Sequence, residues 1–164
     1  MSVEKVGTLI VGGGQAGLAM SEQLSKRGLS HFVVERHRIA ERWRSERWDG
    51  LHANGPAWHD KLPSLSIAGV DPDGFATREQ MVDYFVSYAE RIAAPLRCGV
   101  AVTALTKKAD GTGFRAETSA GAIEATNVVA ATGPFQRPLI PPVVPPEAGI
   151  VQLCGAMAAF TMIL

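Results

Sequence analysis

The chain has 164 residues, of which 46% are hydrophobic and 20% charged, a composition typical of a globular domain large enough to bury a core. Sixteen basic residues balance sixteen acidic ones, so the charge favours neither nucleic acid nor an anionic membrane as a partner. The two cysteines, Cys98 and Cys154, form no C-x-x-C motif, which argues against a redox disulfide and a zinc site. Without a charged and then apolar leader, the chain is expected to be cytoplasmic.

Residues 7–36 predict a strand, a glycine-rich turn, a helix and a second strand. The strands are Thr8 to Val11 and His31 to Val34, and the helix runs from Gln15 to about Lys26. A G-x-G-x-x-G motif joins the first strand to the helix and consists of Gly12, Gly13, Gly14, Gln15, Ala16 and Gly17. Glu35 ends the second strand, about twenty positions further on. This arrangement predicts a Rossmann-like site for a dinucleotide.

Each residue type in this motif has a physical role. Gly12 allows the tight turn, Gly14 leaves room for a pyrophosphate, and Gly17 lets the helix lie close to the first strand. The unpaired N–H groups and the positive dipole end of the helix would face the phosphates. Glu35 can accept hydrogen bonds from an adenosine ribose and would repel a 2′-phosphate, which predicts NAD or FAD. The structural alternative is a glycine-rich turn that binds nothing.

Residues 37–76 lack strong periodicity, which indicates a functional loop. The segment 39–48 predicts a short helix. The indole of Trp43 and the guanidinium of Arg44 are suited to cover a flat ring system and to neutralise a pyrophosphate, although packing of the loop explains them equally well. For Trp58, packing onto the domain is the preferred interpretation.

The second half predicts one helix and four strands. Thr77 and Gln80 form a capping box that opens a helix to about Ala93. One apolar stripe of this helix predicts core: Met81, Phe85, Tyr88 and Ile92. Residues 96–100 predict a third parallel strand, and residues 100–107, 113–118 and 122–126 predict a three-stranded antiparallel β-meander.

The last of these strands runs into residues 127–133, an apolar stretch that predicts a strand buried on both faces. The predicted fold class is therefore α/β, with a Rossmann-like parallel sheet of the FAD/NAD(P)-binding type and an antiparallel β-meander.

Several of these features together resemble the FAD-binding lobe of flavoproteins that bind two dinucleotides. They are Gly12 to Gly17, Glu35-Arg36, the meander, and Ala131-Thr132-Gly133 followed by Pro138 and Pro141. Within that group, Trp43-Arg44, Trp48 to Leu51 and Asn54 are most similar to flavin-containing monooxygenases, including plant YUCCA-like and bacterial relatives. The resemblance spans residues 7 to about 153.

The resemblance implies a role for each candidate residue. The glycine motif holds the FAD pyrophosphate, with Glu35 on the ribose and Arg36 beside it. Trp43 and Arg44 line the flavin side, and Thr132-Gly133 marks the crossing to an NADPH-binding lobe. Asn54 falls near an asparagine that lies beside the flavin during oxygenation, but an asparagine before Gly-Pro is also an ordinary turn residue.

The implied activity is oxygenation of a small molecule at a nitrogen or sulfur nucleophile, using FAD, NADPH and O₂. Because only one glycine motif is present, we expect the FAD-binding portion of such an enzyme, unable to complete turnover alone. A small NAD-dependent dehydrogenase is an alternative, opposed by the meander and by the absence of a Tyr-x-x-x-Lys pair. A non-enzymatic fragment is another.

Three regions are expected along the chain. Residues 1–133 form an incomplete N-terminal FAD-binding domain, residues 134–149 a proline-rich linker, and residues 150–164 an apolar tail shorter than the ~20 residues that span a membrane. Loss of resemblance near Cys154 indicates a truncated or frame-shifted gene. The strand from Val128 to Thr132 would then keep an unpaired edge, which predicts weak FAD binding and self-association.

Overall fold

The computed structural model describes residues 3–133, so the predicted linker (134–149) and tail (150–164) lie outside the described residues. The chain divides into two units, Met1–Ala131 and Thr132–Leu164. The helices and strands of the first unit are β1 (Glu4–Val11), α1 (Gln15–Lys26), β2 (His31–Glu35), α2 (Glu41–Ser45), α3 (Ala57–Asp60), α4 (Arg78–Arg91), β3 (Leu96–Cys98), β4 (Val102–Lys107), β5 (Phe114–Thr118) and β6 (Gly121–Ala130).

One six-stranded sheet organises this unit, with the strand order β3-β2-β1-β6-β5-β4. The first four strands of that order pair in parallel, and β6, β5 and β4 pair antiparallel. The predicted α/β class with a β-meander is confirmed. Val11 pairs with Val34 of β2 and with Ala130 of β6, so the carboxyl ends of three parallel strands lie side by side. The glycine turn follows β1 at this carboxyl-terminal side of the sheet.

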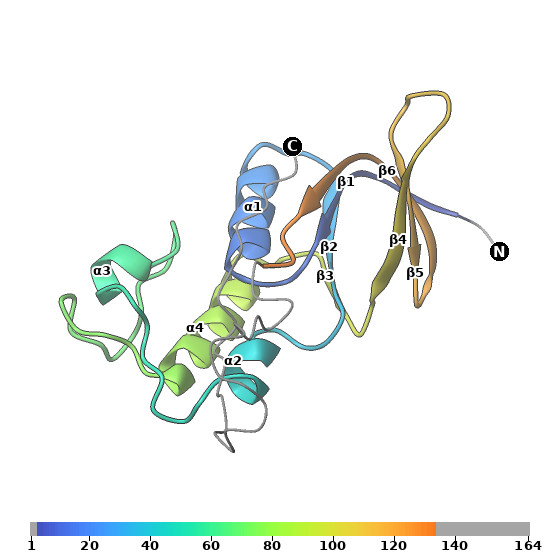
Figure 1. The fold of residues 1–164 in the computed structure, drawn as a ribbon. Coiled ribbons are helices and arrows are strands. Elements are labelled where there is room, and N and C mark those ends of the chain that lie inside the picture. The colour runs from blue at the N-terminus through green and yellow to red at the C-terminus, as the bar shows by residue number, and fades with distance from the viewer. Residues whose placement is uncertain (1–2, 134–164) are drawn as a thin grey trace, which may run out of the picture. The chain divides into compact units, whose positions relative to one another are not determined.

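A helical core covers one side of the parallel strands, where the helices lie in Figure 1. It joins Leu18 of α1 to the predicted stripe of α4, in which Met81, Phe85 and Tyr88 are buried. Ile92 is only partly buried beside them. The capping box is also confirmed, because the Gln80 N–H donates to the Thr77 hydroxyl at 3.2 Å and the Thr77 N–H donates to Gln80 Oε1 at 2.9 Å.

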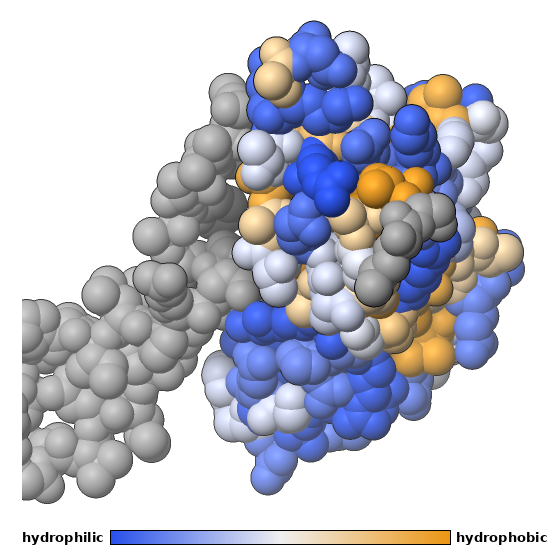
Figure 2. Space-filling view, turned by 90° about the vertical axis from the view of Figure 1, so that its right-hand side faces the viewer, coloured by the Kyte–Doolittle hydropathy of each residue, from blue (hydrophilic) through white to orange (hydrophobic). Residues whose placement is uncertain are grey.

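A second core lies between the parallel strands and the meander. Its buried residues are Leu9, Phe32 and Val34 from β1 and β2, and Ala116, Ile123 and Ala125 from β5 and β6. Outside this core, the side of the molecule that carries the meander is mostly hydrophilic, with small separate apolar patches (Figure 2). The parallel strands are therefore covered on both faces where the site is built.

The prediction that residues 127–133 are buried on both faces is wrong, because none of them is buried. They do not form a separate strand either, since β6 runs without interruption from Gly121 to Ala130. The pairing of β5 with β6 ends at Ala125, so beyond this point β6 has β1 on one side and, within residues 3–133, no strand on the other. Partial exposure follows from this missing neighbour.

The interpretation of Trp58 as a packing residue is also wrong, because its side chain is 55% exposed. Helix α3 has four residues, and Ala57 is the one that it buries. Trp58 instead lies edge-on to the neighbouring His59, with 5.7 Å between the ring centroids. The loop is anchored through its backbone, since the Ala53 N–H donates to the Ala76 carbonyl at 2.8 Å.

Candidate dinucleotide-binding site

The glycine turn is fixed against β2 and against its own helix. Gly12 has a φ of 109°, a conformation that favours glycine, and its N–H donates to the Val34 carbonyl at 2.8 Å. A Cβ at Gly17 would stand 1.9 Å from the carbonyl oxygen of Gly12. Because the Gly12 carbonyl and the Gly17 Cα are both backbone groups that cannot rotate away, only glycine fits at position 17. The first turn of α1 therefore packs directly against the glycine turn.

The start of α1 is open toward solvent. Gly14 is the N-cap, no side chain caps the helix, and a Cβ at Gly14 would meet no atom within 4 Å. Gly14, Gln15 and Ala16 are all exposed, and the first turn carries no acidic residue. Unpaired N–H groups and the positive end of the helix dipole therefore face free space, the arrangement that suits a phosphate group.

Glu35 faces the same turn from the end of β2. One of its carboxylate oxygens accepts the Gly13 N–H at 2.8 Å, and the other accepts the His37 N–H at 3.0 Å. Each oxygen keeps a further lone pair for another donor. The carboxylate thus holds the glycine turn and the segment after β2 together and can still accept hydrogen bonds from a diol.

Two neighbours of this carboxylate have no signature in the sequence. A Cβ at Gly13 would lie 3.1 Å from the Glu35 Cβ and 3.3 Å from the Leu96 Cδ1, so the turn packs closely on both side chains. The other neighbour is His37, which contributes only its backbone N–H. Leu96 is brought to the turn by the pairing of β3 with β2, which no local motif predicts. A backbone N–H such as that of His37 can come from any residue type, so the sequence does not predict it either.

β2 and β6 both end on the side of the sheet where the glycine turn leaves β1. The Ala131 N–H donates to the Val11 carbonyl at 2.8 Å, so β6 keeps contact with β1 up to the glycine turn. Thr132 and Gly133 come next in the chain, and Gly133 has a φ of 78°. Arg36, directly after Glu35, is exposed, and its guanidinium has no hydrogen bond or ion pair within residues 3–133.

The remaining candidates belong to the loop and form a second group. Trp43 in α2 is partly buried, with its ring centroid 6.3 Å from that of Phe85 in α4, and it packs on the same core as Leu18. Arg44 is exposed and lines a shallow cavity of about 340 Å³ with residues of α4. Asn54 is exposed in the turn before α3. No hydrogen bond or ion pair within residues 3–133 joins these three to the glycine turn.

Other kinds of site find no support in the part of the chain that is described. Residues 3–133 contain no group of three or more His, Cys, Asp or Glu side chains able to hold a metal ion. Over the same residues, no helix combines the length and the apolar character needed to cross a membrane.

Comparison with known proteins adds sequence relatives to this geometry. An uncharacterized oxidoreductase, CzcO-like, from Geobacillus kaustophilus (strain HTA426) is 37% identical over 138 residues, covering 84% of this chain and 38% of that protein. Indole-3-pyruvate monooxygenase YUCCA6 from Arabidopsis thaliana is 30% identical over 141 residues, covering 82% of this chain and 33% of that protein. The chain thus spans less than half the length of the curated relatives that it matches.

Solved structures share the fold. A flavin-containing monooxygenase from Stenotrophomonas maltophilia superposes with a TM-score of 0.75 at 23% identity, over 85% of this chain and 42% of that one. Bacillithiol disulfide reductase Bdr from Bacillus cereus gives a TM-score of 0.76 at 23% identity, over 88% and 44% of the two chains. The family model described as pyridine nucleotide-disulphide oxidoreductase matches residues 9–154, and the chain belongs to that family.

Proposed function

We propose that this chain is the FAD-binding portion of an NADPH-dependent, monooxygenase-like flavoprotein. The observation that carries the proposal is the open first turn of α1 at Gly14, with the Glu35 carboxylate holding the same turn. One relative is named as an indole-3-pyruvate monooxygenase and one similar solved structure as a flavin-containing monooxygenase, and together they support a flavin-dependent oxygenation. The substrate would be a small molecule with a nitrogen or sulfur nucleophile, and the NADPH site would lie in another part of the full protein.

The described residues fit a dinucleotide. Backbone N–H groups at the start of α1 would hold the pyrophosphate, and Glu35 would accept hydrogen bonds from the ribose through its spare lone pairs. A second phosphate on that ribose would meet the Glu35 charge, so the site would reject NADP in favour of FAD. When bound, FAD supplies the redox chemistry.

The loop residues would act on the flavin side. The indole of Trp43 would border the ring system while Arg44 neutralises phosphate charge, and the Asn54 amide would lie near the reacting oxygen. Arg44 fits such a role because it is exposed and its guanidinium has no ion pair within the described residues. Thr132 and Gly133 would form the passage to the NADPH-binding lobe.

A disulfide reductase is the less favoured reading of the same fold. The chain has two cysteines, 98 and 154, which do not make a C-x-x-C pair. Although Cys98 is exposed, neighbouring atoms remove part of the solvent around its thiol and raise its pKa, and the nearby Glu35 carboxylate adds to this effect. A reactive cysteine needs the opposite shift, because the thiolate is the nucleophile.

Titration with two cofactors tests the proposal against the NAD-dependent dehydrogenase and the fragment that binds nothing. We expect the purified protein to bind FAD, seen as a change in the visible flavin spectrum and quenching of flavin fluorescence. NADH, followed by its own fluorescence, should bind much more weakly. NADH binding without FAD binding would favour the dehydrogenase, and binding of neither would favour the non-enzymatic fragment.

A further inference from the structure

A tight turn of residues 47–51 lies in the middle of the loop that carries the flavin-side candidates. Arg44, in α2, comes shortly before this turn, and Asn54 comes shortly after it. The Leu51 N–H donates to the Trp48 carbonyl at 3.1 Å and closes the turn. A side chain on the turn is therefore flanked on both sides by residues proposed to face the flavin.

Arg78, the first residue of α4, fixes this turn against the helix. Its Nη1 donates to the Arg47 carbonyl at 3.2 Å and to Asp49 Oδ1 at 2.9 Å, and its backbone N–H donates to the Leu51 carbonyl at 3.0 Å. Its Nε and Nη2 lie 2.9 and 2.8 Å from Glu79 Oε1, a contact that orients the guanidinium. The Arg78 side chain is only 19% exposed. One arginine thus holds the turn at both ends.

Trp48 lies between the two residues that Arg78 Nη1 binds, yet its own side chain is 61% exposed. The Trp48 ring makes no aromatic contact within residues 3–133, whereas the Trp43 ring packs against Phe85. Holding the backbone on both sides reduces the conformational entropy that an indole loses when it binds a ligand. A large indole on a fixed turn is therefore suited to stack on a flat ring.

The turn also lies next to Arg44. Arg44 and Arg78 line the same shallow cavity, of about 340 Å³, so the guanidinium that holds the turn borders the one proposed to neutralise phosphate. Trp48 is thus held in the part of the loop where the proposed function places the flavin.

We propose that Arg78 is a positioning residue that holds Trp48 so that its indole stacks on the flavin ring system of bound FAD. The inference rests on the proposed function, which supplies the flavin, and deepens it by adding one residue that contacts the ring and one that acts through it. The role needs the planar fork of a guanidinium, because a lysine ammonium is a point charge that cannot serve acceptors on several sides.

FAD titrations of Trp48 variants test the contact with the ring. Trp48→Ala should weaken FAD binding about tenfold, the effect of losing one stacked ring, and should alter the visible circular dichroism of the FAD that is bound. Trp48→Phe keeps a flat ring and should recover most of the affinity. Trp58→Ala is the control, since it removes an indole of similar exposure from the same loop and should bind FAD like the wild type.

Arg78→Lys tests the positioning role, because it keeps the charge and removes the fork. FAD affinity should fall by a similar factor, the visible circular dichroism of bound FAD should change, and the Leu51 amide should exchange its hydrogen faster in the FAD-free protein. Arg115→Lys, in an exposed pair with Glu117, is the control and should change none of these quantities. Far-ultraviolet circular dichroism shows whether each variant is folded, and the exposed Trp48 position keeps the test decisive if Arg78→Lys is not.

The outcomes separate this inference from the proposed function. If the wild type binds FAD and Trp48→Ala matches it in affinity and in visible circular dichroism, the inference is overturned and the proposed function stands. Faster exchange at Leu51 in Arg78→Lys, with FAD binding and circular dichroism unchanged, would reduce Arg78 to a structural role and overturn its assignment. A wild-type protein that binds no FAD would overturn both.

Discussion

At the scale of single residues, two glycines of one motif differ in what makes them necessary. A side chain at Gly17 would collide with backbone at 1.9 Å, whereas one at Gly14 would meet nothing within 4 Å. Gly17 is therefore required by the fold, whereas the fold does not require a glycine at position 14, where we propose that it leaves room for a pyrophosphate. The sequence motif predicts both glycines but cannot separate the two reasons.

Gly17→Ala should lower the free energy of unfolding by about 3 kcal/mol, because helix and turn must move apart to admit a methyl group. Urea denaturation measures this change. Gly14→Ala is the matched control and should cost less than about 1 kcal/mol, because the added methyl group meets no atom and the only loss is that alanine caps a helix less well than glycine. Equal effects of the two substitutions would show that the turn does not pack as described.

Glu35→Gln should also destabilise the protein, by about 1–2 kcal/mol. The amide oxygen can accept only one of the two backbone N–H groups that the carboxylate now binds, and the amide nitrogen cannot accept the other. FAD affinity should fall in the same variant. Glu117→Gln, in an exposed pair with Arg115, serves as the control and should have little effect on either quantity. An unchanged FAD affinity in Glu35→Gln would remove this carboxylate from the proposed site.

At the scale of elements, the contact between α1 and α4 depends on a buried carboxylate. Glu22 accepts the Tyr88 hydroxyl, and its folded pKa lies below the ordinary value of 4.5. A lowered carboxylate pKa adds stability that is present above the unfolded pKa and is lost as the pH falls through the folded pKa. The gain therefore belongs to neutral pH and disappears in acid.

Glu22→Gln should consequently destabilise the protein most at pH 7, and the difference from the wild type should shrink as the pH falls below about 4.5. Unfolding in urea at a series of pH values measures the difference, in which the other carboxylates cancel. A difference that stays constant from pH 7 into acid would mean that the Glu22 charge adds nothing to the contact.

The elements that the sequence predicts well are those with local causes. β1, α1 and β2 follow from apolar runs on either side of the glycine motif, and α4 begins at its capping box. The errors concern burial by distant partners. The burial of residues 127–133 depends on where β5 stops pairing with β6. The burial of Trp58 depends on how the loop is anchored to the rest of the domain. Neither property is encoded in the neighbouring residues of the sequence.

At the scale of the whole molecule, the sheet presents edges of different character. β3 has three residues and carries Arg97, and β4 has an irregular register between Val102 and Ala104 and ends on Lys107. Short strands, irregularities and charges protect an edge from pairing with another chain. Residues 126–130 of β6 carry no charge and, within the described residues, no strand lies on their outer side.

We expect this β6 edge to promote self-association. Sedimentation velocity over a range of concentrations should show oligomers, and Asn127→Lys should shift them toward monomer by placing a charge on the edge. Leu105→Lys adds the same charge to the exposed face of β4 and should have a smaller effect. A wild-type protein that stays monomeric at high concentration would count against association through β6.

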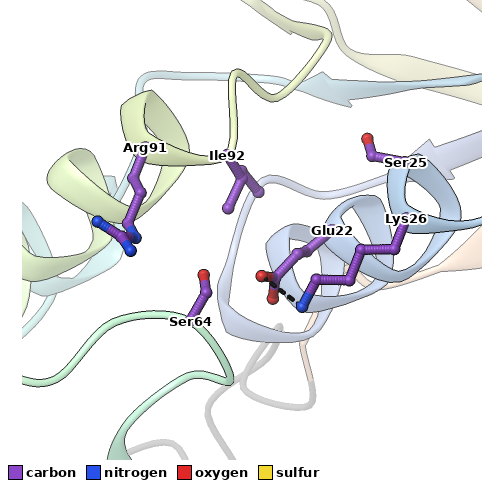
Figure 3. Close-up of a pocket in the computed structure, with 6 residues that line it drawn as sticks. All are labelled: Glu22, Ser25, Lys26, Ser64, Arg91 and Ile92. Carbon is purple, nitrogen blue, oxygen red and sulfur yellow. Dashed lines mark ion pairs between the residues drawn. The ribbon is translucent and has the colours of Figure 1, made fainter.

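The candidate site, like the fold, has one part that the sequence predicts and another that depends on distant contacts. Its first group, at Gly12 to Gly17 and Glu35, follows from sequence alone because strand, turn and helix are contiguous. The positions of Trp43, Arg44 and Asn54 depend on a loop packed by distant contacts such as that of Trp43 with Phe85. The cavity between α1, the loop after α3 and the end of α4 (Figure 3) has no signature in the sequence, because its lining residues, among them Glu22, Ser64 and Arg91, share no motif.

The affinity of Gly14→Asp for FAD tests the central claim, that the opening of α1 holds a diphosphate. The fold should tolerate aspartate, a preferred N-cap residue, with a gain of a few tenths of a kcal/mol in stability. FAD binding should nevertheless weaken at least about a hundredfold, as charge and bulk enter the phosphate space. Ala109→Asp, in the exposed β4–β5 turn, should bind like wild type. A folded Gly14→Asp protein with wild-type affinity for FAD would contradict the claim.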